Sequence, residues 1–287
     1  MRHPIRNLCV FSFWFFFLAL TPVSAADKIA AVLYAKDGLT SVNQPATIEV
    51  RLVEKRLLAG GGLGGEPIEL LVDGKVVATA MTGGDGKAIL AYTPTRLGSV
   101  PLRVRVGASP RAGPAETQAQ LAVWERRNPI VMVEMASLMD VQSAQSPLPG
   151  INLVREQDRK PMPDAADELA KLTQFLYRVL YVATMPASGM DGFSAATGAR
   201  EWLKANKFPD GHVLVLPAGG EAVGAKLDAL HAAGWKTVKT GIGRTPAFAE
   251  AFLQRRLEAI LVPEPEKGEA PRKAKVAKEW KEVRKKL

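Results

Sequence analysis

The sequence predicts two folded domains of different classes: an antiparallel β-sandwich, followed by an α/β domain with a mostly parallel sheet. The chain has 287 residues, which is room for roughly two domains. Up to residue 125, short β-branched runs are separated by glycine-rich turns, as in sandwiches. From residue 128 onward, apolar strands alternate with amphipathic helices, which is typical of strands covered on both faces.

Residues 1–26 have the three parts of a secretory signal peptide. Arg2 and Arg6 give a positive start, an apolar run follows over 8–20, and small residues allow cleavage after Ala25 or Ala26. The run is shorter than the roughly 20 residues of a spanning helix, and an uncleaved anchor is the alternative. We therefore expect a periplasmic or secreted protein. Its mature chain has no cysteine, because Cys9 is the only one, and this excludes disulfides and thiolate chemistry.

Residues 27–125 form the expected sandwich. Alternating or β-branched runs predict strands over 29–34, 46–53, 67–72, 87–92, 100–106 and 118–124. The glycines at 60–65 and 83–86 predict turns and not phosphate-binding loops, since neither group precedes a helix. The turn sequences at 72–75, 82–88 and 92–94 resemble those of bacterial immunoglobulin-like modules of exported proteins, which implies an immunoglobulin-like sandwich.

Residues 128–265, reached through a short connection at 126–128, form the expected α/β domain. Continuous apolar runs predict strands over 130–133, 179–183, 213–216, 238–242 and 259–262. Amphipathic spacing and end signals predict helices over 164–175, 195–205, 222–233 and 245–254. Thr245 and Pro246 are a cap and a first residue suited to the last of these helices. Ligands of such sheets bind at the carboxyl ends of the strands, so chemistry is expected there.

Residues 266–287 form a basic tail in which nine residues are Lys or Arg. Much of the formal net charge of +9 therefore belongs to the tail and not to the domains. Val276, Trp280, Val283 and Leu287 would form one narrow apolar stripe on a helix. Such a helix could dock on the protein's own body or fray, or it could contact an anionic membrane surface or an acidic partner. Nucleic acid is disfavoured for an exported chain.

Four stretches of the α/β segment resemble the haloacid dehalogenase (HAD) superfamily, in particular its lipin-like and related phosphatidate phosphatase branch. They are Ile130-Val-Met-Val-Glu-Met-Ala-Ser-Leu138, Leu180-Tyr-Val-Ala-Thr-Met-Pro186, Arg200-Glu-Trp-Leu with Phe208-Pro-Asp-Gly211, and Gly241-Ile-Gly-Arg-Thr-Pro-Ala-Phe-Ala-Glu-Ala-Phe252 with the strand after it. The resemblance implies a HAD-like α/β fold. It also implies a site in which one Asp attacks phosphorus and binds Mg²⁺, a second Asp donates a proton, and Thr and Lys hold the phosphoryl oxygens.

Most of the side chains that this chemistry needs are missing. The position of the nucleophile holds Glu134, and that of the proton donor holds Ala136. Leu138, Arg244 and Phe248 stand at three further family positions, and only Thr184 and Lys226 match in type. A carboxylate displaced by about 1 Å can cost about 10²-fold in rate. A missing general acid costs about 10²–10⁴-fold more, and without acidic ligands Mg²⁺ is lost.

Three readings follow from this pattern. We favour a catalytically silent HAD-like protein, without cofactor, that acts in binding or scaffolding at the cell envelope. The alternative is a divergent phosphatase that acts on phosphoric esters through Glu134 or Asp140, with Mg²⁺. The third is a generic α/β domain unrelated to that family.

Glu134 itself can be a satisfied carboxylate at a strand end. Strand ends and helix N-termini also collect anions, so Glu134, Thr184, Lys226 and Arg244 are candidates for a retained anion pocket. The two histidines of the mature chain, His212 and His231, lack metal-ligand spacing and are expected to be structural.

Overall fold

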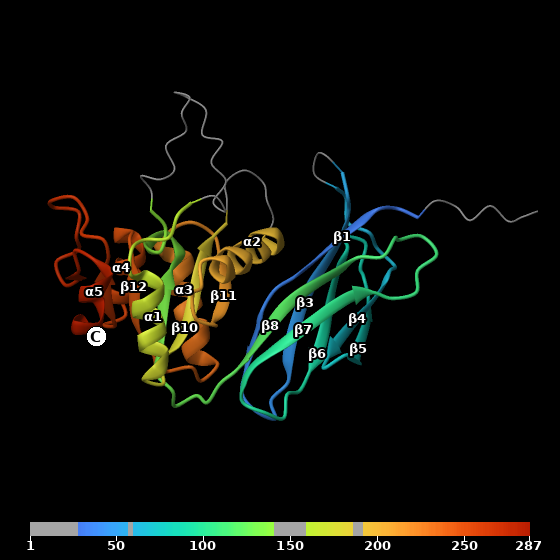
Figure 1. The fold of residues 1–287 in the computed structure, drawn as a ribbon, viewed down its shortest axis with the longest axis horizontal. Coiled ribbons are helices and arrows are strands. Elements are labelled where there is room, and N and C mark those ends of the chain that lie inside the picture. Colours follow the sequence, from blue (N-terminus) through green and yellow to red (C-terminus); the bar gives the residue numbers. More distant parts are fainter. Residues whose placement is uncertain (1–27, 57–59, 141–158, 186–191) are drawn as a thin grey trace, which may run out of the picture.

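The computed structural model describes residues 28–56, 60–140, 159–185 and 192–287, which form two parts side by side (Figure 1). The expected signal peptide and Cys9 lie outside the described residues. Among the described helices, none is both long and apolar enough to cross a membrane. The first part is a sandwich of β-sheets and the second is an α/β unit, so the two predicted fold classes are confirmed at this level.

The sandwich packs a three-stranded sheet against a five-stranded sheet. The smaller sheet has the order β1-β3-β6, with β1 (Ala31–Ala35), β3 (Ala46–Glu54) and β6 (Lys87–Tyr92). The larger has the order β2-β8-β7-β4-β5, with β2 (Gly38–Thr40), β8 (Glu116–Val123), β7 (Gly98–Val106), β4 (Pro67–Val72) and β5 (Lys75–Met81). All pairs are antiparallel except β2 with β8.

Period-two alternation explains why these segments are strands. Along β3, Ala46, Ile48, Val50 and Leu52 are buried in the core between the sheets, while the residues between them face outward. The strands β2 and β5 go beyond the prediction, because neither shows a clear alternation of apolar and polar residues in the sequence. The strand β2 has three residues, and β5 lies at the edge of its sheet with Val76 and Val77 both exposed.

The α/β part is built on a parallel six-stranded sheet of order β11-β10-β9-β12-β13-β14. Its strands are β9 (Ile130–Glu134), β10 (Arg178–Thr184), β11 (His212–Leu216), β12 (Val238–Gly243), β13 (Glu258–Leu261) and β14 (Lys275–Val276). The first strand of the α/β part, β9, lies between β10 and β12 and is buried along its whole length. All five strands predicted here are present.

Helices cover both faces of this sheet, and each face has its own core. The helices are α1 (Ala165–Gln174), α2 (Gly192–Ala205), α3 (Gly220–Ala232) and α4 (Pro246–Leu253). Val131 and Val133 of β9 pack with residues of α1 and α2, whereas Ile130 and Met132 pack with residues of α3 and α4. The core that contains Ile130 also includes Trp124, which follows β8, so the sandwich shares a core with the α/β part.

The tail is part of the α/β fold, and the single helix expected over it is not formed. Its first half contributes β14, which pairs with β13 at the edge of the sheet. A four-residue helix, α5 (Trp280–Val283), follows, and a short 3-10 helix (Arg284–Lys286) comes after it. Trp280 and Val283 are fully buried in the core beneath α1, and the Trp280 indole donates a hydrogen bond to the Ser137 carbonyl at 3.0 Å. Docking on the protein's own body is therefore confirmed.

Candidate functional site

Glu134 is the last residue of β9, and its carboxylate is bound within the fold. One carboxylate oxygen accepts hydrogen bonds from the backbone N–H groups of Arg244 at 2.7 Å and Thr245 at 2.9 Å. The other accepts one from the Thr245 hydroxyl at 2.7 Å. The side chain is only 6% exposed, so three donors of one loop satisfy a buried charge. Glu134 is thus a satisfied strand-end carboxylate, one of the two roles expected of it.

The groups that donate hydrogen bonds to Glu134 lie at the start of α4. Thr245 is the N-cap of this helix, as predicted, and its hydroxyl oxygen accepts a hydrogen bond from the Phe248 N–H at 3.3 Å. Backbone N–H groups and the helix dipole favour an anion at such a position. Here the anion is a side chain of the protein itself. The loop can approach so closely because residue 243 is glycine: a Cβ there would lie 2.4 Å from the Phe248 ring and 2.9 Å from Glu134.

Arg244 lies beside Glu134 at the carboxyl end of β9, the position at which the family resemblance implies a catalytic crevice. Its guanidinium donates a hydrogen bond to the Met139 carbonyl at 3.1 Å and makes a longer contact of 3.5 Å with the Ala136 carbonyl. Burial lowers the pKa of the Arg244 guanidinium, and attraction to Asp140 and Glu134 opposes this. The short 3-10 helix after β9 (Met135–Ser137) is therefore tied to the β12–α4 loop. The side chains of Glu134 and Arg244 therefore occupy the carboxyl end of the central strand.

The crevice does not fit the Mg²⁺ ion that the HAD resemblance implies. Both oxygens of Glu134 are engaged by hydrogen-bond donors, and the guanidinium of Arg244 adds a positive charge beside them. Residue 136 is alanine and offers no oxygen ligand from its side chain. Within the described part of the chain, no group of three or more His, Cys, Asp or Glu side chains is placed to hold a metal.

Of the other two pocket candidates, Thr184 lies at the same edge of the sheet as Glu134, and Lys226 lies elsewhere. Thr184 ends β10, two residues beyond Val182, which is opposite Glu134 in the sheet. Lys226 lies on α3 and lines a cleft of about 400 Å³ between the two halves of the molecule, together with Lys36 and Glu49 of the sandwich. The structure thus brings Glu134 and Arg244 together but places Lys226 in different surroundings, so the four residues do not form the expected pocket.

Burial is the main cause of the shifted pKa values of two groups in this cleft. It lowers the pKa of the Lys226 ammonium, with repulsion from Lys36 adding to the effect and attraction to Glu49 opposing it. It also lowers the pKa of His212 to about 3, helped by the charge of Lys226 and opposed by a hydrogen bond with the backbone of Gly38. The Nδ1 atom of His212 has no hydrogen-bond partner among the described residues. His212 is therefore a neutral, buried ring at neutral pH.

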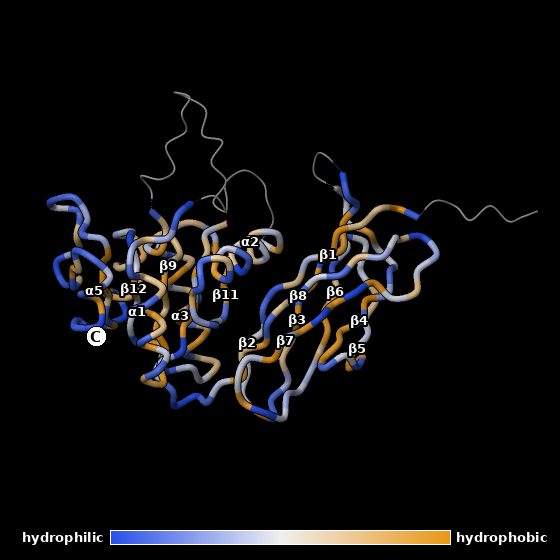
Figure 2. The backbone as a smooth tube through the Cα atoms, in the orientation of Figure 1, coloured by the Kyte–Doolittle hydropathy of each residue, from blue (hydrophilic) through white to orange (hydrophobic). Residues whose placement is uncertain are grey.

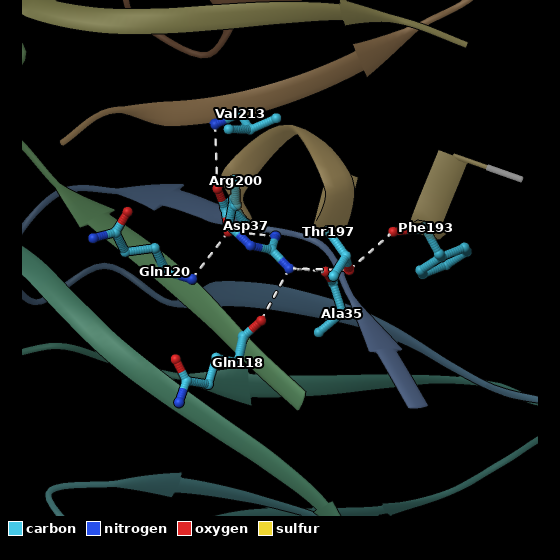
Figure 3. Close-up of polar contacts among 8 residues, drawn as sticks. All are labelled: Ala35, Asp37, Gln118, Gln120, Phe193, Thr197, Arg200 and Val213. Atoms are coloured by element: carbon cyan, nitrogen blue, oxygen red, sulfur yellow. Dashed lines mark hydrogen bonds and ion pairs between the residues drawn. The ribbon is translucent and has the colours of Figure 1, made fainter. Parts of the chain in front are cut away.

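A buried ion pair that the sequence did not reveal joins the two halves (Figure 3). The Asp37 carboxylate, before β2, accepts a hydrogen bond from the Arg200 guanidinium of α2 at 2.8 Å. The same carboxylate accepts from the backbone N–H groups of Gln120 at 3.0 Å and Val213 at 3.2 Å. Burial raises the pKa of the Asp37 carboxyl, and Arg200 and these donors oppose the change.

Arg200 makes further hydrogen bonds across this interface between the two halves. Besides Asp37, it donates to the carbonyls of Ala35 at 3.0 Å and Gln118 at 2.9 Å, both in the sandwich (Figure 3). The Asp37 side chain is 0% exposed and that of Arg200 15%. Asp37 precedes a glycine and looks like an ordinary turn residue in the sequence, so no local signal could have predicted its partner 163 residues away.

Comparisons with known proteins give little beyond the fold class. No family model and no curated protein matches the chain. Among solved structures, D,D-heptose 1,7-bisphosphate phosphatase from Burkholderia thailandensis is similar at 10% identity and a TM-score of 0.38, over 53% of this chain and 93% of that one. The CARDB domain of the PF1109 protein from Pyrococcus furiosus is similar at 18% identity and a TM-score of 0.22, over 34% and 94%. The human B7-H4 IgV-like domain is similar at 10% identity and a TM-score of 0.24, over 32% and 96%.

Proposed function

We propose that the chain is an exported, catalytically silent HAD-like protein with an immunoglobulin-like domain, and that it acts by binding or scaffolding at the cell envelope. One observation carries the proposal: the carboxylate of Glu134, at the position of the nucleophile, is bound to the N-terminal end of α4 within the fold. To attack phosphorus, Glu134 would have to give up hydrogen bonds to Arg244 and Thr245. Ala136 could not then protonate a leaving group.

The arrangement of the sheet supports the HAD-like part of this proposal. The strand that carries Glu134 comes first along the chain among the strands of this sheet and is central in it, and β10 and β12 flank it. The residues singled out by the resemblance, Glu134, Thr184 and Arg244, lie at or just beyond the carboxyl ends of these three strands. No free catalytic group is left at these strand ends under this proposal, since Glu134 is bound by the loop that carries Arg244 and Thr245.

An assay of the purified mature protein with Mg²⁺ and p-nitrophenyl phosphate tests the proposal. We expect hydrolysis at the rate of the buffer with Mg²⁺ alone. We also expect Glu134→Gln to lower the free energy of unfolding by about 2–3 kcal/mol in urea titrations, because it removes a charge-assisted acceptor at a buried site. Glu250→Gln, on the exposed face of α4, is the matched control and should change stability by less than about 0.5 kcal/mol.

The outcome that contradicts silence is Mg²⁺-dependent turnover that disappears in Glu134→Gln. That result would favour the divergent phosphatase. Export is tested separately, by the mass of the protein recovered from a cell-envelope extract. The mature chain should begin after Ala25 or Ala26, and an intact N-terminus would contradict a cleaved signal peptide.

A further inference from the structure

Three loops meet at the amino edge of the α/β sheet, opposite the crevice. The connection before β9 is bound to the start of β10, next to the α1–β10 loop, because the Arg178 N–H donates to the Pro129 carbonyl at 2.8 Å. It is also bound to the α3–β12 loop, where the Thr237 hydroxyl donates to the Arg126 carbonyl at 3.2 Å. The pairing of β12 with β13 brings the α4–β13 loop alongside.

Two large apolar side chains stand exposed on this edge. Phe175 and Leu176 follow α1 directly, and their exposed fractions are 62% and 65%. Leu176 has a φ of 67°, in the left-handed region that disfavours a residue with a large side chain. The apolar face of α1 is already buried through Leu169 and Leu172, so this pair has no part in the helix's own packing. Exposed apolar side chains at neighbouring positions leave apolar surface that can be buried against something outside the chain.

Exposed basic side chains lie on the other segments of this edge. Arg126 and Arg127 come from the connection before β9, Lys236 from the α3–β12 loop and Arg256 from the α4–β13 loop. Among the described residues Arg127 pairs with Glu125, while Lys236 and Arg256 have no ion-pair partner. We call these four residues, with Phe175 and Leu176, the basic apolar edge. Figure 2 shows the hydrophobic end of α1 next to the hydrophilic chain that leads in from the sandwich.

We propose that the basic apolar edge docks on an anionic phospholipid bilayer. The cations match anionic headgroups, and the exposed Phe-Leu pair enters the apolar phase that a purely charged partner such as nucleic acid does not offer. The tail cannot supply this contact, because its apolar residues Trp280 and Val283 are buried in the core. The edge lies at the amino ends of the strands and Glu134 at their carboxyl ends, so membrane contact does not depend on whether the Glu134 end is catalytic.

Co-sedimentation of the mature chain with vesicles tests the proposal. The wild-type protein should pellet with phosphatidylglycerol–phosphatidylethanolamine vesicles and not with phosphatidylcholine vesicles, and high salt should weaken the binding. Lys236→Gln with Arg256→Gln should weaken it about 30-fold, since each basic side chain near an anionic surface contributes a factor of about five. Phe175→Ser with Leu176→Ser should weaken it at least about tenfold.

Two matched controls separate this edge from general charge and stickiness. Met81→Ser with Ile89→Ser removes apolar side chains of similar exposure, 60% and 64%, from the sandwich. Lys278→Gln with Lys281→Gln removes two exposed tail lysines, one of which is paired with Asp164 at the start of α1, away from the edge. Both controls should bind within about twofold of the wild type, since they leave all the contacts of the edge in place.

A residue-level readout reports on insertion. The fluorescence of Phe175→Trp should shift to shorter wavelength on anionic vesicles and be quenched by brominated acyl chains, whereas that of Ile89→Trp should not. The proposal is overturned if the wild type does not pellet with anionic vesicles, or if the edge variants bind like the wild type. It is also overturned if the tail variant loses as much binding as the edge variants. A further contradicting outcome is that Phe175→Trp pellets with the vesicles but its fluorescence is not quenched, since the edge would then bind charge without entering the bilayer, as it would bind an acidic partner.

Discussion

At the residue scale, the length of the Glu134 side chain determines which hydrogen-bond donors its carboxylate can reach. An aspartate at the end of β9 would stop one carbon–carbon bond, about 1.5 Å, short of the N–H groups at residues 244 and 245. The extra methylene lets the carboxylate reach the start of α4, where it accepts hydrogen bonds from Arg244 and Thr245. The one methylene by which glutamate exceeds aspartate thus lets the carboxylate bind the loop at the start of a helix.

His212 gives a prediction for the dependence of stability on pH. In the unfolded chain its ring binds a proton below about pH 6.5, whereas in the folded chain burial delays this to about pH 3. Between these values the unfolded state binds more protons, so stability falls as the pH falls. We expect His212 to contribute a loss of about 1.4 kcal/mol per pH unit between pH 6 and pH 4.

Urea titrations at several pH values measure this slope, and His212→Gln isolates it because glutamine does not titrate. The wild type should lose stability more steeply than the variant on acidification. The raised pKa of Asp37 acts in the opposite direction, and it is present in both proteins. Parallel pH profiles for the two proteins would show that His212 is already charged in the native state.

At the scale of elements, the sequence predicts what depends on periodicity and misses what depends on tertiary contact. The α/β strands are recognised because runs such as residues 130–134 are buried on both faces. The strand β5 is missed because at a sheet edge its exposed Val76 and Val77 need not alternate. In the tail, the spacing of Trp280 and Val283 suits a long helix, but pairing of β14 with β13 uses the segment before them as a strand.

The same limit applies to the candidate site. Parallel strands bring their carboxyl ends to one edge, so Glu134 and Arg244 could be placed together from the sequence. The direction in which a helix points a side chain depends on packing, so the position of Lys226 facing the sandwich could not be predicted. The N-cap at Thr245 was predictable because it rests on local hydrogen bonding.

The tail segment gives a prediction at this scale. Trp280 is fully buried beneath α1, and its indole N–H is bound to the Ser137 carbonyl next to the crevice. Trp280→Ala should therefore lower the free energy of unfolding by about 3–5 kcal/mol. Trp280→Phe should cost less, because it keeps most of the packing and loses the hydrogen bond. Urea denaturation followed by circular dichroism measures both, and a loss below about 1 kcal/mol for Trp280→Ala would contradict the buried position.

At the scale of the whole molecule, the interface joins the two halves through a shared core and a buried ion pair, and we expect them to unfold as one cooperative unit. Trp124, after the last strand of the sandwich, is buried in the same core as Ile130 and Leu180 of the α/β sheet. Beside this apolar contact lies the Asp37–Arg200 pair, with further bonds from Arg200 to sandwich carbonyls. These contacts hold the surfaces of the two halves, the basic apolar edge among them, at a fixed relative orientation.

Arg200→Leu tests this coupling. The substitution leaves the fully buried Asp37 carboxylate without its cation, which should cost about 3–5 kcal/mol, and it removes the bonds to Ala35 and Gln118. In the wild type, urea transitions followed by tryptophan fluorescence and by circular dichroism should coincide. Fluorescence reports mainly on the α/β half, which holds Trp202, Trp235 and Trp280, so in Arg200→Leu the two transitions should separate.

Adding Asp37→Asn to Arg200→Leu removes the unpaired charge and supplies the control. The double variant should recover part of the lost stability, because the penalty of Arg200→Leu comes largely from an uncompensated buried carboxylate. It should still show separated transitions, since the bonds that cross between the halves are not restored. Coincident transitions in Arg200→Leu would mean that the shared core around Trp124 couples the halves without the ion pair.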